Sequence, residues 1–223
     1  MTSLKNNNFL SANKYNQMIF WFAVLFSIIN IIFITNSALI DVGREGYSRW
    51  IFYYHVPIAW NASIAFLLGG INSFFYLRKK EKIYDDRALA FSELGALFGF
   101  LVLFSGFIWA EPAWQTNWRW EPRLTTTLIL ELIYLGYFMV KAYGGNYEKT
   151  SIYRSYISIM SLIMLPIIYY SVQFLPDSAQ AHPGQGKFLE YGGLTVFLFS
   201  LLSFSILLNF LYSFRIFNLR KEK

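Results

Sequence analysis

The sequence predicts an all-α integral membrane protein, built as a bundle of six transmembrane helices with a tryptophan-rich loop outside the membrane. Hydrophobic residues account for 56% of its 223 residues and charged residues for only 14%, whereas an average soluble domain has roughly 25% charged residues. Apolar stretches of about 20 residues, enough for one helix to cross the hydrocarbon layer, recur along the whole chain. The composition therefore excludes a disordered chain, a small secreted domain and a nucleic-acid-binding module.

Six apolar stretches are long enough to span a bilayer, and together they form a single membrane domain over residues 1–223. We expect the spans at about 17–40, 52–77, 88–108, 124–143, 152–175 and 189–214. The first stretch exceeds the roughly 7–15 apolar residues of a signal-peptide core, so we expect it to be an uncleaved first helix.

Three features inside the spans predict local structure. Gly95 and Gly99 form a G-x-x-x-G pattern in the third span, which allows a neighbouring helix to approach closely. Pro166 predicts a kink in the fifth span, because proline has no N–H to bond the Leu162 carbonyl. Glu93 and Glu131 are carboxyls within spans; each is either functional or a protonated, hydrogen-bonded group, and we place both outside the predicted site.

Basic residues predict the orientation of the helices in the bilayer. Of 19 lysines and arginines, 14 fall on the side that carries both termini, if the chain crosses six times. Because cytoplasmic loops carry an excess of basic residues, we expect a cytoplasmic (inner) membrane protein with both termini in the cytoplasm. The net charge of +6 is then largely a consequence of topology. The loop 109–123 and the connections between spans one and two and between five and six face outward.

The two histidines of the chain, His55 and His182, both fall on the outer side in this topology. Neutral imidazole is the commonest metal ligand, and two imidazoles can bind haem iron above and below its plane. A structural zinc site needs four ligands, and the chain has no cysteine. The alternative is that each histidine is a hydrogen-bonded residue at the membrane interface.

The predicted outer loop, 109–123, is rich in tryptophan and in charged residues. It contains four of the seven tryptophans, Trp109, Trp114, Trp118 and Trp120, together with Arg119, Glu121 and Arg123. Aromatic faces stack on planar rings and guanidinium groups bind carboxylates, so the loop suits a flat, apolar, anionic ligand. An extended loop would put Trp114, Trp118 and Trp120 on one face, whereas a helical loop would align only Trp114 with Trp118. The alternative is a belt of tryptophans that anchors the helices at headgroup depth.

These motifs, taken in order, resemble those of the CcmC family of haem-handling proteins in cytochrome c maturation. The run Trp118-Arg119-Trp120-Glu121-Pro122-Arg123 resembles the tryptophan-rich "WWD" signature of that family, with Glu121 at the acidic position and Gln115 where a glycine is usual. Tyr54-His55-Val56-Pro57 lies upstream and the segment around Pro166 downstream, as in six-span CcmC proteins. Larger relatives of the CcsA or CcmF type hold a second haem with further histidines, which this chain lacks.

The resemblance implies that the outer loop binds haem b non-covalently and that His55 and His182 are its axial ligands. Trp109, Trp114, Trp118, Trp120 and Glu121 would form the platform for the macrocycle, and Arg119, Arg123 or Arg49 would meet the propionates. The haem would then pass to a chaperone of the CcmE type, with an ATP-binding cassette transporter of the CcmAB type supplying energy. The chain has no G-x-x-x-x-G-K-[ST] motif of its own. We therefore expect a haem-trafficking component rather than an enzyme.

Two other classes of function also fit the residues. One is a b-type membrane cytochrome or quinone-linked electron carrier, in which the haem stays bound and changes redox state. The other is a small-molecule transporter without haem, in which the tryptophans are only an interfacial belt. The haem content of the purified protein distinguishes the haem-free transporter from both haem proteins. Transfer of the haem to a chaperone distinguishes haem trafficking from the cytochrome or electron carrier.

Overall fold

The computed structural model describes residues 8–39, 46–174 and 193–221 of the chain, and all regular structure in these residues is helical. The helices are α1 (Phe9–Ala12), α2 (Lys14–Leu39), α3 (Gly46–Lys79), α4 (Lys82–Trp114), α5 (Pro122–Tyr143), α6 (Tyr147–Ser161), α7 (Met164–Tyr170), the 3₁₀ helix η1 (Ser171–Phe174) and α8 (Leu194–Lys221). Six segments are long and apolar enough to cross a membrane, with α6 and α7 counted as one. The prediction of an all-helical protein with six spans is therefore confirmed.

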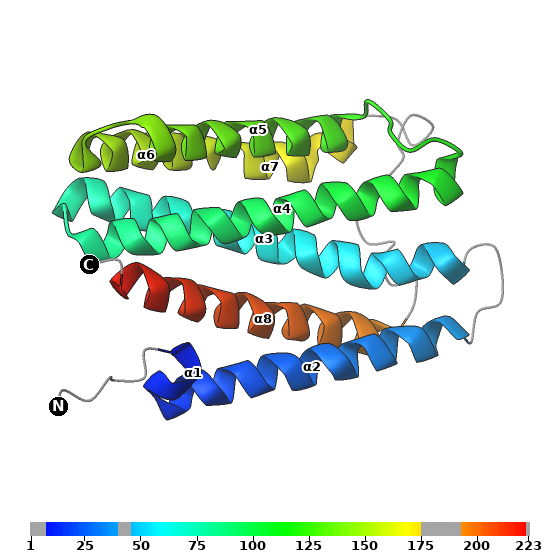
Figure 1. Ribbon diagram of the computed structural model, residues 1–223. Helices are drawn as coiled ribbons and strands as arrows, with labels where there is room; N and C mark the ends of the chain where they lie inside the picture. The colour runs from blue at the N-terminus through cyan, green and yellow to red at the C-terminus, as the bar shows by residue number, and fades with distance from the viewer. Residues whose placement is uncertain (1–7, 40–45, 175–192, 222–223) are drawn as a thin grey trace.

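The helices run roughly parallel or antiparallel along one axis (Figure 1). The α3–α4 pair lies in the middle, with α5, α6 and α7 on one side and α8 followed by α2 on the other (Figure 1). One end of the bundle, called here the terminal end, holds α1, the last turn of α8 and the turns 80–81 and 144–146. The opposite end, called the tryptophan end, holds residues 115–121.

Several helices extend beyond the apolar stretches that predict them. The third span was expected at 88–108, but α4 covers Lys82–Trp114; the second was expected at 52–77, but α3 covers Gly46–Lys79. Hydropathy marks where a helix leaves hydrocarbon, whereas the helix itself continues until its backbone is capped or broken. At the end of α4 that cap is Gln115, whose backbone is left-handed and whose N–H bonds the Glu111 carbonyl at 2.8 Å.

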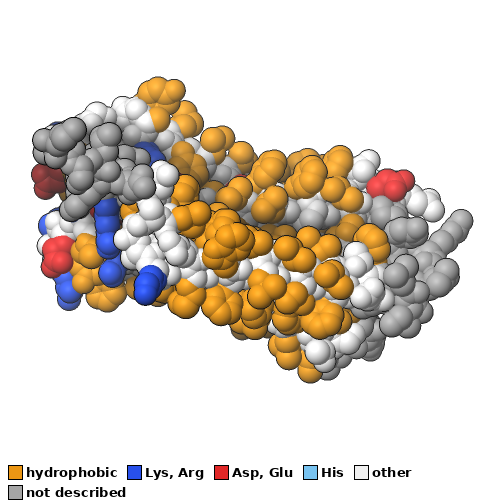
Figure 2. Space-filling model, turned by 60° about the horizontal axis from the view of Figure 1, so that its bottom comes forward, with side chains coloured by type: hydrophobic (Ala, Val, Ile, Leu, Met, Phe, Trp, Pro, Cys, Tyr) orange, Lys and Arg blue, Asp and Glu red, His pale blue; other side chains and the backbone are white. Residues whose placement is uncertain are grey.

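The outer surface of the bundle is apolar in its middle. Figure 2 shows hydrophobic side chains covering the central part of the visible face, with lysines and arginines gathered at one end. Large apolar side chains are exposed on several helices, among them Trp21 on α2, Phe100 on α4 and Leu132 on α5. Such a belt is suited to a hydrocarbon environment and would be unfavourable in water.

Small residues on α4 accept large side chains from its neighbours. A Cβ atom added to Gly95 would lie 2.6 Å from the ring of Phe66 on α3, and one added to Gly99 would collide with the carboxyl of Glu131 on α5. The Phe66 ring is itself buried and packs on Tyr134 of α5, with ring centroids 4.3 Å apart. The G-x-x-x-G pattern therefore serves helix packing, because it makes room for side chains from two different helices.

Ion pairs join α4 to three other helices near the terminal end. Glu93 of α4 accepts hydrogen bonds from Lys141 of α5 at 2.7 Å and from Nη2 of Arg215 of α8 at 3.0 Å. Asp85 of α4 accepts from Nη2 of Arg154 of α6 at 3.0 Å, and both side chains are only 4% exposed. Glu93 thus has a structural partner on each side, in keeping with its placement outside the predicted site.

The fifth span is divided at the position where proline was expected to bend it. α6 ends at Ser161 and α7 begins at Met164. Pro166 has no N–H for the Leu162 carbonyl, and that carbonyl instead accepts from the N–H of Leu165 at 3.2 Å, the tighter spacing of a 3₁₀ turn. The proline therefore breaks the span into two helices, which is a stronger effect than a kink.

The contact between Gly95 and Phe66 predicts a specific loss of stability. We expect Gly95→Ala to destabilise the detergent-purified protein by about 1–3 kcal/mol, the usual cost of overpacking a filled core. Gly136→Ala on α5 is the matched control, because nothing lies within 4 Å of a Cβ added there. Alanine is the better helix former by about 1 kcal/mol, so the control should be neutral or stabilised. Equal midpoints of thermal unfolding for the two variants would contradict this packing argument.

Candidate functional site

The connection at the tryptophan end is shorter than the predicted loop. Its irregular part is Gln115–Glu121, because α4 continues to Trp114 and α5 begins at Pro122. Proline suits the first position of a helix, where its missing N–H has no partner to lose. The expectation that residues 109–123 form a loop is therefore wrong at both ends, and Trp109 and Trp114 lie on the last turns of α4.

Two of the four tryptophan rings of this segment contact each other. The centroids of the Trp118 and Trp120 rings lie 5.5 Å apart at an interplanar angle of 77°, which is an edge-to-face contact. Trp118 is half-buried, whereas Trp120 is 76% exposed. Trp109 is half-buried on α4, and the side chain of Trp114 lies outside the described part of the structure. Neither the extended nor the helical arrangement predicted for residues 114–120 is observed.

The charged residues of the segment differ in their surroundings. Arg119 is exposed, and Glu121 is 6% exposed at the N-cap position of α5, where its side chain makes no capping bond. Arg123, on the first turn of α5, donates from Nη2 to the backbone carbonyl of Tyr169 at 3.3 Å. Arg123 thereby joins the start of α5 to the end of α7, the helix that precedes the segment carrying His182.

His55 is held between α3 and α4. Its Nδ1 lies 2.9 Å from Oγ of Ser105 on α4, and its Cε1 would lie 3.4 Å from a Cβ atom at Gly106. Trp109 follows Ser105 by four residues, so the two side chains share a face of α4, one turn apart. The structure therefore brings His55 next to the turn of α4 that leads into the tryptophan segment.

Two predicted site residues cannot be placed. His182 lies outside the described residues, and of Arg49 only the helical backbone, near the start of α3, is described. Within the described part of the chain, no group of three or more histidine, cysteine, aspartate or glutamate side chains forms a metal site.

Sequence reasoning missed three residues that contact predicted site residues. Ser105 and Gly106 were not predicted to belong to the site, and neither was Tyr169, whose carbonyl accepts from Arg123. A signal for Ser105 exists in the spacing, because it lies one helical turn before Trp109. That signal becomes readable only when α4 is known to continue past residue 108.

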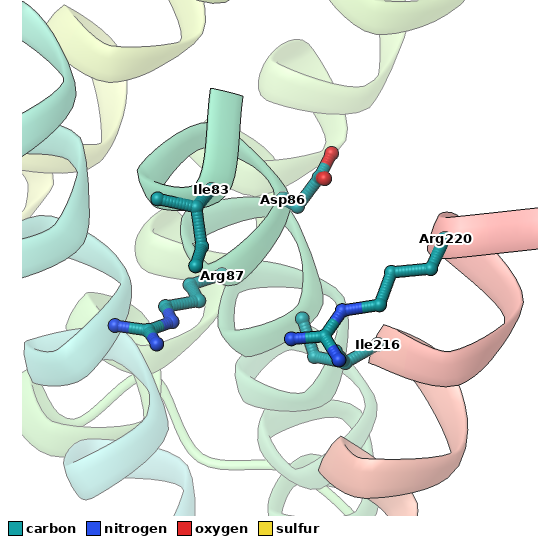
Figure 3. A pocket seen from close by; sticks show the side chains of 5 residues that line it. All are labelled: Ile83, Asp86, Arg87, Ile216 and Arg220. Carbon is teal, nitrogen blue, oxygen red and sulfur yellow. The ribbon is translucent and has the colours of Figure 1, made fainter. Parts of the chain in front are cut away.

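Cavities occur at the other end of the bundle. A cavity of about 90 Å³ lies between the start of α4 and the end of α8, lined by Ile83, Asp86, Arg87, Ile216 and Arg220 (Figure 3). A second cavity, of about 290 Å³, is lined by residues of α4, α5, α6, α8 and the turn after α5, among them Asp85 and Arg154. None of the residues that line these two cavities is a predicted site residue.

The arrangement of the chain defines a helical, multi-span membrane protein. At one end of its bundle lies a tryptophan-rich segment with Arg119 and Arg123, beside a histidine held between two helices. The model of one protein family, "CcmC: Heme exporter protein C", matches residues 3–220. The chain belongs to this family, as its motifs predict.

Individual relatives agree with this assignment. The chain is 31% identical over 191 residues to heme exporter protein C of Bradyrhizobium diazoefficiens, across 84% of this chain and 73% of that protein. It is 28% identical over 165 residues to heme exporter protein C of Escherichia coli, across 71% of this chain and 67% of that protein. A putative cytochrome c biosynthesis ccmC-like mitochondrial protein of Arabidopsis thaliana is 37% identical over 138 residues, and the chain spans about half (51%) of its length.

Proposed function

We propose that this protein binds haem at the tryptophan end and delivers it to a haem chaperone during cytochrome c maturation. The observation that carries the proposal is the place of His55, fixed by Ser105 one helical turn from Trp109, at the root of the tryptophan segment. Membership of the heme exporter protein C family supports the same role. Haem is the cargo in this proposal, and it is held without a covalent bond.

The residues at the tryptophan end have the chemistry that haem requires. Imidazole nitrogen is a common axial ligand of haem iron, and His55 supplies one; His182 would supply the second from the opposite face. The ring of Trp120 is exposed and contacts the ring of Trp118, so it offers an aromatic surface for the macrocycle. Trp109 and Trp114 would add to this surface. Guanidinium groups bind carboxylates in bidentate geometry, so the haem propionates would be bound by Arg119, Arg123 and Arg49. Glu121 is the acidic residue of the family motif and belongs to the same proposed site.

The chaperone of the CcmE type and the transporter of the CcmAB type are the partners in this proposal. The terminal end is the cytoplasmic end, and the tryptophan end lies outside the cytoplasmic membrane. The basic residues support this orientation, because those at the terminal end outnumber those at the tryptophan end. Energy for release of the loaded chaperone would come from the transporter.

Loss of either proposed ligand should change the haem spectrum. We expect His55→Ala to lose the low-spin, bis-histidine absorption spectrum of the purified protein, and free imidazole to restore it by occupying the vacated position. His182→Ala should lose it likewise. The control is Asn72→Ala, on the same helix but nearer the terminal end. It removes a side-chain amide that donates to the Leu68 carbonyl of α3. A spectrum of His55→Ala identical to that of the wild type would remove His55 from the site.

The tryptophans should act on haem rather than on insertion. We expect simultaneous replacement of Trp114, Trp118 and Trp120 by Leu to preserve membrane insertion, because leucine is favourable in hydrocarbon, and to weaken haem binding. Stacking contributes about 0.5–1.5 kcal/mol per aromatic pair, so the triple variant should lose roughly tenfold or more in affinity.

The matched control for this triple variant replaces two exposed tryptophans elsewhere, Trp21 and Trp60, by Leu. The quantity to measure is haem per inserted protein, followed by transfer to the apo chaperone. A ratio equal to wild type in the triple variant would exclude the platform and leave an anchoring belt. Haem that binds normally but is never transferred would favour the cytochrome alternative.

The orientation is tested by reporters at the two ends of the bundle. A reporter inserted at Lys80, in the turn between α3 and α4, should be cytoplasmic, and one at Asn117, in the tryptophan segment, should be external. Fluorescent and alkaline-phosphatase fusions give opposite readings in the two compartments. The reverse pattern would put the candidate site on the wrong side of the membrane for delivery to an external chaperone.

A further inference from the structure

The Ser105 hydroxyl contacts His55 and the backbone of its own helix at the same time. Its Oγ lies 2.9 Å from Nδ1 of His55, 2.7 Å from the Leu101 carbonyl and 3.2 Å from the Val102 carbonyl. A hydroxyl has one proton to donate and two lone pairs that accept, and a carbonyl oxygen can only accept. The direction of each hydrogen bond therefore follows from where that single proton goes.

Only one tautomer of His55 allows the Ser105 Oγ to form hydrogen bonds both with Nδ1 of His55 and with the Leu101 carbonyl. If Nδ1 carries the imidazole proton, Ser105 accepts from Nδ1 and donates its own proton to the Leu101 carbonyl. If Nε2 carries the proton instead, Nδ1 and the Leu101 carbonyl are both acceptors, and the Ser105 proton can satisfy only one of them. Two acceptor oxygens 2.7 Å apart repel each other when no proton lies between them, so the Nδ1–H tautomer is favoured.

We infer that Ser105 is a positioning residue for His55: it fixes the Nδ1–H tautomer and so leaves the lone pair on Nε2, the nitrogen that would bind the haem iron. The inference rests on the proposed function. Ligating histidines characteristically donate their second N–H to an acceptor outside the metal's own ligands, which fixes the tautomer and the ring orientation. Ser105 would be that acceptor, supplied by the helix that leads into the tryptophan segment.

The backbone of α4 limits the orientation of the ring as well. Cε1 of His55 would lie 3.4 Å from a Cβ atom at Gly106, so the edge of the ring between its two nitrogens faces α4 at this point. Ser105 contacts Nδ1, the ring nitrogen nearer the main chain of His55. Gly106 has no side chain and so leaves room for Cε1. Two successive residues of α4 thus define both the tautomer and the direction of the ring.

The first test requires no haem. Because the chain has only two histidines, a His182→Gln protein labelled with ¹⁵N-histidine gives NMR signals of His55 alone. Protonated and unprotonated imidazole nitrogens have well-separated ¹⁵N shifts, measured at mildly alkaline pH, where an ordinary imidazole is neutral. We expect a protonated Nδ1 and an unprotonated Nε2. A dominant Nε2–H signal would overturn the inference without any change to Ser105.

The second test uses variants with a matched control. Ser105→Ala removes the acceptor, and Ser105→Thr keeps a hydroxyl on the same carbon. Ser205→Ala is the control, because Ser205 of α8 makes the same intrahelical bond, to the Leu201 carbonyl at 2.8 Å, on another helix. We expect Ser105→Ala to show both tautomers by NMR and to bind haem 10–100-fold more weakly, the usual effect of losing such a partner, with a smaller low-spin fraction.

Ser105→Thr and Ser205→Ala should match the wild type in both measurements. A Ser105→Ala protein with an unchanged tautomer and unchanged haem affinity would overturn the inference. Equal losses in Ser105→Ala and Ser205→Ala would overturn it too, because they would indicate a general effect of the missing hydroxyl on the helices. A wild-type protein that binds no haem would overturn the proposed function, while the haem-free NMR spectrum would still decide which nitrogen carries the proton.

Discussion

The close approach of α3 to α4 fixes the positions of Phe66 and His55, because α4 presents small residues where α3 presents large ones. Phe66 fills the space over Gly95, and His55 lies against Ser105 and Gly106. In hydrocarbon, helix association gains little from the hydrophobic effect and depends on van der Waals packing and on interhelical hydrogen bonds. The contact between α3 and α4 supplies both, with packing in the middle of the bundle and a hydrogen bond towards the tryptophan end.

α4 is also the helix through which the other elements are aligned. Asp85 joins it to α6, and Glu93 joins it to α5 and α8, all near the terminal end. Removing one partner of the buried Asp85–Arg154 pair would leave an uncompensated charge and cost about 3–5 kcal/mol. The partly exposed pairs of Glu93 add to this resistance against sliding of the helices along one another. The depth of Ser105 relative to α3, and hence the contact with His55, depends on that alignment.

Much of the fold could be predicted from the sequence, and less of the site. Apolar length was enough for the six spans, and Pro166 was enough to locate the break between α6 and α7, because both signals are local. The end of α4 was missed, since nothing in the hydropathy distinguishes a helix that stops at residue 108 from one that leaves the hydrocarbon and continues to Trp114. Family motifs identified the tryptophan segment and His55, but they contain no information on how two rings meet. The contact between Trp118 and Trp120 and the bond from Ser105 to His55 are tertiary facts, which depend on the register of two helices or on the path of an irregular segment.

The hydrogen bond between His55 and Ser105 joins the imidazole to a neutral hydroxyl, and this has a consequence for how long a bound metal would stay. A carboxylate in the same place would pull strongly on the Nδ1 proton and make Nε2 a more basic, tighter ligand. A hydroxyl that already gives its own proton to the Leu101 carbonyl orients the ring with much less polarisation. Differences in affinity between related sites lie mostly in the dissociation rate. Under the proposed function, Ser105 therefore combines a well-defined ligand geometry with a short residence time, which is what a carrier needs if its cargo is to move on to the next protein.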